Sequence, residues 1–98
     1  IAWIGPHISQ KNFEVDDLVF AHFQAYPDCF LPTKVTGKYH ANLQRITQAK
    51  LSALGIKQIF SADMCTYENE ALFFSHRRAT HQGLTQTGRM VTGIYLQP

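Results

Sequence analysis

The sequence predicts an α/β (α+β) fold in which helices pack outside a layered, mixed β-sheet. Two observations support this prediction. The expected elements follow one another in the order β-α-α-β-β-β, which is typical of layer structures. The last strands are apolar on both faces, as in a sheet that is covered on both sides. With 98 residues, 45% of them hydrophobic and 16% charged, the chain fits one small globular domain.

The N-terminal part is expected to contain one strand and one helix. Residues 1–5, IAWIG, have apolar side chains and a closing glycine, which indicates a strand. Residues 5–15 read as a loop because Gly and Pro begin them. Residues 16–26 are rich in apolar positions and predict a helix. Asp16 or Asp17 is placed to cap it, because a carboxylate accepts the free amide hydrogens of a first turn.

The middle of the chain is expected to hold a loop followed by an amphipathic helix. Residues 27–38 contain two prolines and a glycine, so we expect a mobile surface loop there. Residues 39–55 predict a helix, with Gly55 as its left-handed C-terminal cap and Ile56 folding back against it. The apolar positions that share one face of this helix are Leu43, Ile46, Leu51 and Leu54.

The C-terminal part is expected to supply three strands. The first follows the helix directly and covers residues 56–62. The second, residues 71–76, is the apolar run ALFFSH, and the third covers residues 89–97. Residues 77–88 are rich in Gly, Thr and Gln, and we expect them to form a long hairpin loop.

Composition restricts the class of function. The net charge is +2 and the sequence pI is about 8.7, too weakly basic to indicate nucleic-acid binding. No apolar run reaches the roughly 20 residues of a membrane span, and no signal peptide is recognisable. Cys29 and Cys65 are expected to be free thiols in a reducing cytoplasm. Because the sequence opens on a strand at Ile1, we expect the C-terminal part of a longer protein.

Cys65 is a candidate catalytic residue. It lies in the segment DMCTY, directly after a predicted strand, where α/β folds concentrate functional groups. A cysteine there suits a nucleophile or a metal ligand, provided that its thiolate is stabilised. A small, buried hydrophobic role is the commoner fate of a free cysteine. Both interpretations stay open.

The adjacent Arg77 and Arg78 are candidate anion-binding residues. On a strand end their side chains would point to opposite faces, so one of them would face a cleft. A guanidinium fixed there suits phosphate or carboxylate, because its planar fork donates two parallel hydrogen bonds. The alternative is a structural ion pair with a nearby acid. The candidate acids are Asp63, Glu68 and Glu70.

The five histidines do not predict a metal centre within the chain. Their spacing gives neither HxxxH nor HExxH, and a pair of histidines makes a weak site. They are His7, His22, His40, His76 and His81.

Four motifs together resemble a known family. In order along the chain they are IGPHISQKNFEV, DMCTY, FFSHRR and TGRMVTGIYL. They resemble the C-terminal half of the YfiH-type family, the laccase-domain or polyphenol oxidase family related to purine nucleoside phosphorylases that act with zinc. The resemblance covers nearly the whole chain. Two segments depart from it, since residues 78–87 look longer than the family's turn and residues 27–38 look inserted.

The resemblance implies that residues 1–98 are the C-terminal part of a single YfiH-like domain. Its partner is then the N-terminal half of the same protein, which supplies the metal ligands, one cysteine and two histidines. The implied cofactor is zinc, or copper under the oxidase label, and the implied substrates are a purine nucleoside and phosphate. Cys65 and Arg77 are expected to be catalytic, and Arg77, Arg78 and His76 to bind substrate.

Two non-enzymatic hypotheses remain beside the enzyme. In the first, the chain is a basic docking module for phosphate-rich partners, using Arg77, Arg78, Lys11 and Arg45. In the second, it is only scaffold, with its cysteine and arginines engaged in structural contacts.

Overall fold

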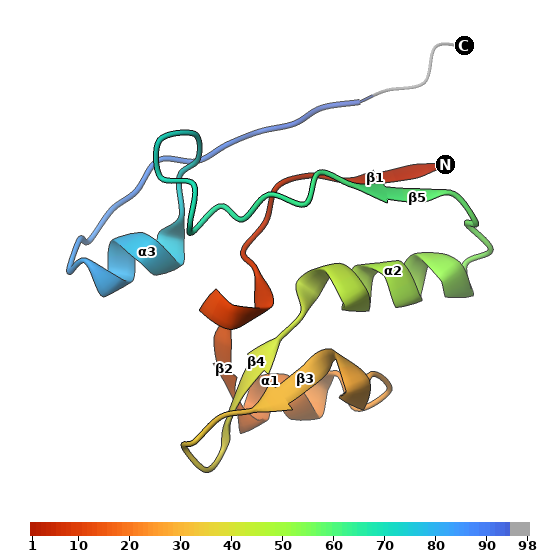
Figure 1. Cartoon of the computed structure of the whole chain (residues 1–98), viewed down its shortest axis with the longest axis horizontal. Coiled ribbons are helices and arrows are strands. Elements are labelled where there is room, and N and C mark those ends of the chain that lie inside the picture. The colour runs from red at the N-terminus through yellow and green to blue at the C-terminus, as the bar shows by residue number, and fades with distance from the viewer. Residues whose placement is uncertain (95–98) are drawn as a thin grey trace.

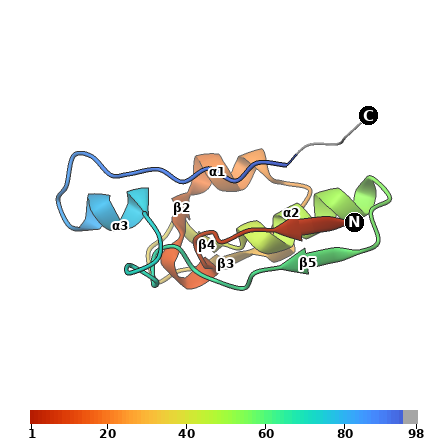
Figure 2. The same cartoon turned by 90° about the horizontal axis from the view of Figure 1, so that it is seen from above.

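The computed structural model describes residues 1–94 and shows a mixed α/β fold (Figures 1 and 2), as the sequence predicts. It contains two small sheets, three α-helices and two short 3-10 helices. In chain order the elements are β1 (Ala2–Ile4), η1 (Gln10–Asn12), β2 (Glu14–Asp16), α1 (Asp17–His22), η2 (Pro27–Cys29), β3 (Phe30–Pro32), β4 (Lys38–Ala41), α2 (Leu43–Ala53), β5 (Ile59–Ser61) and α3 (His76–His81).

The two sheets differ in the direction of their strands. β1 and β5 form a parallel pair in which Trp3 lies opposite Phe60. β2, β4 and β3 form an antiparallel sheet with β4 at its centre. α2 lies between the two sheets in Figure 1 and contacts both β5 and η2. The parallel pair therefore connects the N-terminal segment to the segment that carries Cys65.

The core lies on one face of the antiparallel sheet. Phe20 of α1 stacks on Tyr39 of β4, with 4.4 Å between ring centroids, and meets Phe30 of β3 edge-on at 5.2 Å. Such aromatic pairs add about 0.5–1.5 kcal/mol beyond the area that they bury. The buried members of the core are Val15, Cys29, Phe30, Ala41 and Ile46.

α2 ends as the sequence predicts. Gly55 has φ +88°, its N–H donates to Ser52 O at 3.0 Å, and Ile56 N–H donates to Leu51 O at 3.1 Å. These two bonds form a Schellman motif, which satisfies carbonyls at the helix end. Leu54 is nevertheless 79% exposed, so the predicted apolar face stops one turn short of the cap.

The helix boundaries predicted around the core are only partly right. Asp16 caps α1 by accepting Val19 N–H at 3.2 Å, but α1 ends at His22 instead of running to residue 26. The first residues predicted as the second helix belong to β4 instead, because pairing on both edges satisfies their backbone groups. α2 begins at Leu43, after Asn42 accepts Arg45 N–H at 3.0 Å.

The two loops predicted before this helix contain structure. Residues 27–38 hold η2 and β3, and Cys29 and Phe30 there are buried in the core. The prediction of a mobile surface loop is therefore wrong for that part, because burial of these two side chains outweighs the local preference of the prolines for turns. Residues 5–15 likewise contain η1 and the start of β2.

The strand predicted for residues 71–76 is wrong. Leu72 lies in a turn and is exposed, and α3 begins at His76, inside the expected strand and hairpin loop. Ser75 is the physical reason, because its Oγ accepts Arg78 N–H at 3.2 Å and caps the helix. The periodicity of so short an apolar run does not by itself show whether the run forms a strand or a turn.

The last predicted strand is not formed in the part that the structure describes. Residues 89–94 carry no strand pairing, and Val91 and Ile94 are exposed. Residues 95–97 lie outside the described part. In Figure 1 the chain after α3 runs back as an extended trace.

Candidate functional site

Two polar cavities lie on either side of η1. The first, about 580 Å³, lies between α3 and the strands β2 and β4, and we call it the arginine cavity because Arg77 lines it. The second, about 350 Å³, lies beside the loops that follow β1 and β5, and we call it the cysteine cavity because Cys65 lines it. Lys11 and Asn12 line the first and Gln10 lines the second, so η1 forms the wall between them.

Cys65 lies where the two parallel strands end. It forms an isolated parallel bridge with His7, in which His7 N–H donates to Met64 O at 3.2 Å and Thr66 N–H donates to His7 O at 2.9 Å. Cys65 follows β5 and His7 follows β1. Ligand sites of open α/β sheets lie at such carboxyl ends. The fold thus brings a cysteine, a histidine and Asp63 to one cavity.

The Cys65 thiol is buried, 7% exposed, but hydrogen-bonded. Burial by itself raises the pKa of this thiol. The hydrogen bonds outweigh burial: those from Ser9 come first, followed by those from the backbone of Glu68 and Tyr67, and they leave the pKa of Cys65 below its ordinary value. Ser9 N–H lies 3.2 Å from Sγ and Asn12 Nδ2 3.7 Å. The site therefore favours a thiolate more than a buried apolar cysteine does.

The guanidinium of Arg78 is hydrogen-bonded to backbone carbonyls. Its Nη1 donates to Thr66 O at 2.8 Å and to Tyr67 O at 3.0 Å, and its Nη2 donates to Phe73 O at 2.8 Å. These three bonds tie the loop after Cys65 to α3. One of the two hypotheses for the arginines was an ion pair with a nearby acid, and for Arg78 backbone carbonyls take the place of that carboxylate.

Arg77 lines the arginine cavity. Its Nη1 donates to Glu14 O at 2.8 Å, and its guanidinium carbon lies 5.2 Å from the centre of the Phe13 ring. Both arginines belong to α3, so the prediction that they sit at a strand end is wrong. They still point in different directions, because successive helix residues are turned by about 100°.

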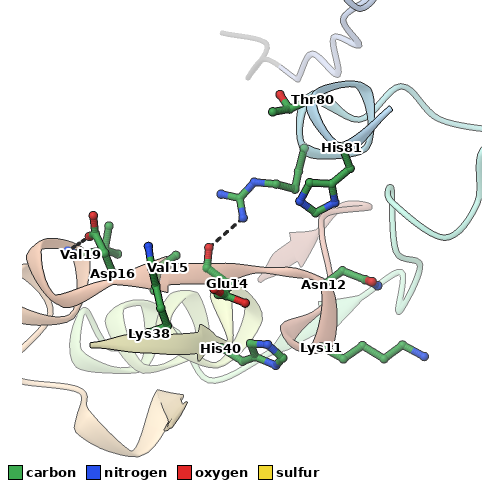
Figure 3. Close-up of a pocket in the computed structure, with 11 residues that line it drawn as sticks. Lys11, Asn12, Glu14, Val15, Asp16, Val19, Lys38, His40, Thr80 and His81 are labelled. Carbon is green, nitrogen blue, oxygen red and sulfur yellow. Dashed lines mark hydrogen bonds between the residues drawn. The ribbon is translucent and has the colours of Figure 1, made fainter. Parts of the chain in front are cut away.

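The opposite wall of the arginine cavity comes from β4. Lys38 and His40 alternate along this strand with Tyr39, whose ring packs into the core, so both face the cavity (Figure 3). Glu14 and Asp16 of β2 line the same cavity. The cavity therefore mixes cationic and anionic groups.

The remaining predicted site residues are dispersed. His76 is the exposed first residue of α3. Glu68 pairs with Lys11 at 2.6 Å, and no ion pair within residues 1–94 joins an arginine to Asp63, Glu68 or Glu70. Cys65 and Arg77 line different cavities.

Sequence reasoning missed His7, Ser9 and Asn12 as neighbours of Cys65, because it treated residues 5–15 only as a loop. The available signal was that this segment and residues 63–67 both follow predicted strands. Strand direction decides whether two such loops meet, and the sequence leaves that direction open.

No metal-binding group is formed by the described residues alone. Within residues 1–94, no three or more His, Cys, Asp or Glu side chains converge in a way that could hold a metal ion. The same part of the chain contains no helix that is both long and apolar enough to cross a bilayer.

The basic residues of the docking hypothesis do not form one free patch. Arg45 on α2 donates to Asp28 O at 2.8 Å, and Lys11 is paired with Glu68. Arg78 is engaged by its three carbonyls. Of the four, Arg77 and Lys11 line the arginine cavity, which Lys38 also lines, whereas Arg45 and Arg78 do not.

Comparison with known proteins identifies the family. Residues 1–97 match the family described as multi-copper polyphenol oxidoreductase laccase. The chain is 37% identical over 102 residues to a purine nucleoside phosphorylase of Haemophilus influenzae, covering 99% of this chain and 40% of that protein. It is 35% identical over 98 residues to the purine nucleoside phosphorylase YfiH of Escherichia coli, covering 98% of this chain and 38% of that protein.

A solved structure supports the same relationship. The crystal structure of the Neisseria meningitidis protein NMB0706, assigned to DUF152, superposes with a TM-score of 0.70 at 29% identity, covering 78% of this chain and 33% of that one. The chain spans about two fifths of the length of the curated relatives that it matches. The chain belongs to the multi-copper polyphenol oxidoreductase laccase family, the YfiH-type family that its four motifs indicate.

Proposed function

We propose that this chain is the C-terminal part of a single YfiH-like domain that catalyses phosphorolysis of purine nucleosides. The observation that carries the proposal is its identity of 35–37% to two proteins named purine nucleoside phosphorylase, across 98–99% of its own length. In this reaction a phosphate oxygen forms a bond to C1′ of the ribose. The C1′–N bond breaks, and the base leaves with the bonding electron pair and takes up a proton.

Arg77 is the proposed phosphate ligand. Its Nη1 is held by Glu14 O, and a single carbonyl leaves other N–H groups of the guanidinium to donate into the arginine cavity. Lys38 adds a second positive charge from the facing strand. Charge-assisted hydrogen bonds of this kind orient phosphate and offset the charge that develops as it attacks.

Cys65 is proposed to act beside the nucleoside, because its pKa is lowered at the edge of a cavity. The hydrogen bonds of Arg78 to three backbone carbonyls favour a structural role for this side chain over substrate binding. His76 is exposed at the start of α3, and its predicted contact with substrate requires the rest of the domain.

The metal is proposed to lie on the other part of the domain. The resemblance to the family implies that zinc, or copper if the family's oxidase description applies, is held by the N-terminal half; the described residues 1–94 form no ligand set of their own. A bound metal would supply Lewis-acid chemistry. The free thiols of Cys29 and Cys65 suit the reducing cytoplasm in which we place the protein.

The rest of the domain is proposed to cover the β1–β5 pair. Trp3 and Phe60 are register partners that lie side by side on one face of the pair, and they are 60% and 53% exposed. Parallel sheets are almost always covered on both faces, and an isolated two-stranded sheet is marginal in water. An N-terminal half packed against these side chains would remove both difficulties.

Phosphorolysis by the full-length protein tests this function. We expect inosine and phosphate to give hypoxanthine and ribose 1-phosphate, and a chelator to abolish turnover. Oxidation of a polyphenol in the same preparation, without phosphorolysis, would favour the oxidoreductase activity and contradict the proposal.

A further inference from the structure

The cysteine cavity is lined by neutral amides and acids, and by neither lysine nor arginine. Its amide side chains are Gln10, Asn42, Gln44 and Asn69, and its acids are Asp63 and Glu68. A cavity of about 350 Å³ lies within the range of small-molecule sites, roughly 300–1,000 Å³. The carboxylates of its two acids disfavour an anion such as phosphate.

Two side chains that line this cavity are held in place by one hydrogen bond and keep another polar atom that makes none within the described part of the chain. Asn42 Oδ1 accepts Arg45 N–H at 3.0 Å, which fixes the amide and leaves Nδ2 as a donor. His7 Nδ1 donates to Gly5 O at 2.9 Å, so Nε2 is an acceptor in the neutral ring. Within residues 1–94, no hydrogen bond engages Asn42 Nδ2 or His7 Nε2.

Asp63 is held in an unusual conformation. Its φ of +52° lies in the left-handed region, which costs non-glycine residues energy and is found at functional sites. Ser61 Oγ accepts Asp63 N–H at 3.1 Å and donates to Gln44 Oε1 at 2.7 Å. Gln44 Nε2 in turn donates to Asp63 Oδ1 at 3.4 Å. Asp63 lines the cavity, and within residues 1–94 no hydrogen bond engages its Oδ2.

We propose that the cysteine cavity binds the purine base of the nucleoside, with Asp63 accepting an N–H of the base and Asn42 Nδ2 donating to an adjacent acceptor. A purine edge presents a donor beside an acceptor. Asp63 and Asn42, which both line the cavity, supply an acceptor and a donor of the complementary kinds. The inference rests on the proposed function and assigns a separate location to one part of its substrate. Phosphate belongs on the other side of η1, where Arg77 and Lys38 lie.

Two substitutions remove the recognition groups while keeping the local fold. Asp63→Asn retains a residue that tolerates positive φ, and Asn42→Asp retains the oxygen that caps α2. In the full-length protein, titration calorimetry with hypoxanthine should show the dissociation constant rising at least about 10-fold in each variant. Inorganic phosphate should bind as in the wild type. Glu70→Gln, an exposed acid outside the cavity, serves as the control and should change neither affinity.

The outcomes separate this inference from the function on which it rests. If the wild type turns over inosine but both variants bind hypoxanthine within twofold of wild type, the base lies elsewhere and only the inference is overturned. If the wild type neither turns over inosine nor binds hypoxanthine, the proposed function fails and the inference fails with it.

Discussion

Arg77 and Arg78 are neighbours on α3, yet they contact different parts of the molecule. Arg78 donates three hydrogen bonds to the carbonyls of Thr66, Tyr67 and Phe73. Arg77 donates one, to Glu14 O, and faces the arginine cavity. The different roles come from the turn of the helix between successive residues.

The alanine variants of these arginines should therefore fail in different ways. Arg78→Ala should lower the free energy of unfolding by about 2–3 kcal/mol, because it removes charge-assisted bonds and leaves carbonyls unpaired. Arg77→Ala should lower kcat/KM about 10- to 150-fold through lost contact with phosphate, with a smaller loss of stability. Parallel kinetics and denaturant melts of the full-length variants check this. Loss of stability alone in both would make both arginines structural.

The Cys65 thiol should react at lower pH than an ordinary cysteine. Its pKa is lowered because hydrogen bonds from Ser9 and the following loop outweigh burial. The rate of iodoacetamide alkylation should therefore reach half its maximum below pH 9.0, the ordinary value for a thiol, and Ser9→Ala should shift that midpoint upward. Cys29, whose pKa is raised by burial, is the internal control. A Cys65 midpoint at or above that of Cys29 would contradict the assignment.

The same shift gives a pH dependence of stability. A thiol whose pKa falls on folding stabilises the folded state fully above its unfolded pKa, and this contribution is lost as pH falls through the folded pKa. Between the folded pKa and about 9.0, the free energy of unfolding should rise with pH relative to Cys65→Ser. Equilibrium unfolding at several pH values checks this, and parallel curves for the two proteins would contradict it.

At the residue scale, the sequence predicted which side chains to examine but not their partners. Cys65 and the arginine pair stand out by type and position. Ser9 and Asn12 reach Cys65 across more than fifty residues, and such contacts depend on strand order and direction, which local patterns do not encode.

At the scale of elements, the predictions held where a local rule acts alone. The Schellman cap of α2 depends on Gly55 and its immediate neighbours, and it was predicted correctly. The strand predicted for residues 71–76 failed because an apolar run suits a strand, a turn or a buried helix, while the capping bond of Ser75 favours a helix. Phe30 was assigned to a loop because prolines flank its segment, yet it packs in the core.

Gly55→Ala measures the cap of α2 directly. A Cβ at Gly55 would meet no heavy atom within 4 Å, so its cost comes only from the left-handed backbone. We expect a loss of about 1–2 kcal/mol in the free energy of unfolding. Gly93→Ala, which also meets open space but lacks a positive φ, should cost little. Equal effects of the two substitutions in denaturant melts would show that the cap does not contribute.

At the scale of the whole molecule, we propose that the chain is one part of a larger domain. Its core is small, and the parallel pair β1–β5 exposes Trp3 and Phe60 on one face. The order of the expected elements predicted a mixed α/β fold correctly. The uncovered face follows from tertiary arrangement, and the sequence pattern alone did not show it.

We propose that this chain supplies one wall of an active site and that catalysis needs the rest of the domain. The most direct measurement is inosine phosphorolysis at equal concentrations of the full-length protein and of residues 1–98 alone, with and without added zinc. Circular dichroism of the shorter chain controls for its folding. We expect turnover only from the full-length protein. Zinc-dependent turnover by residues 1–98 alone would contradict the account, because the chain would then contain a complete catalytic centre.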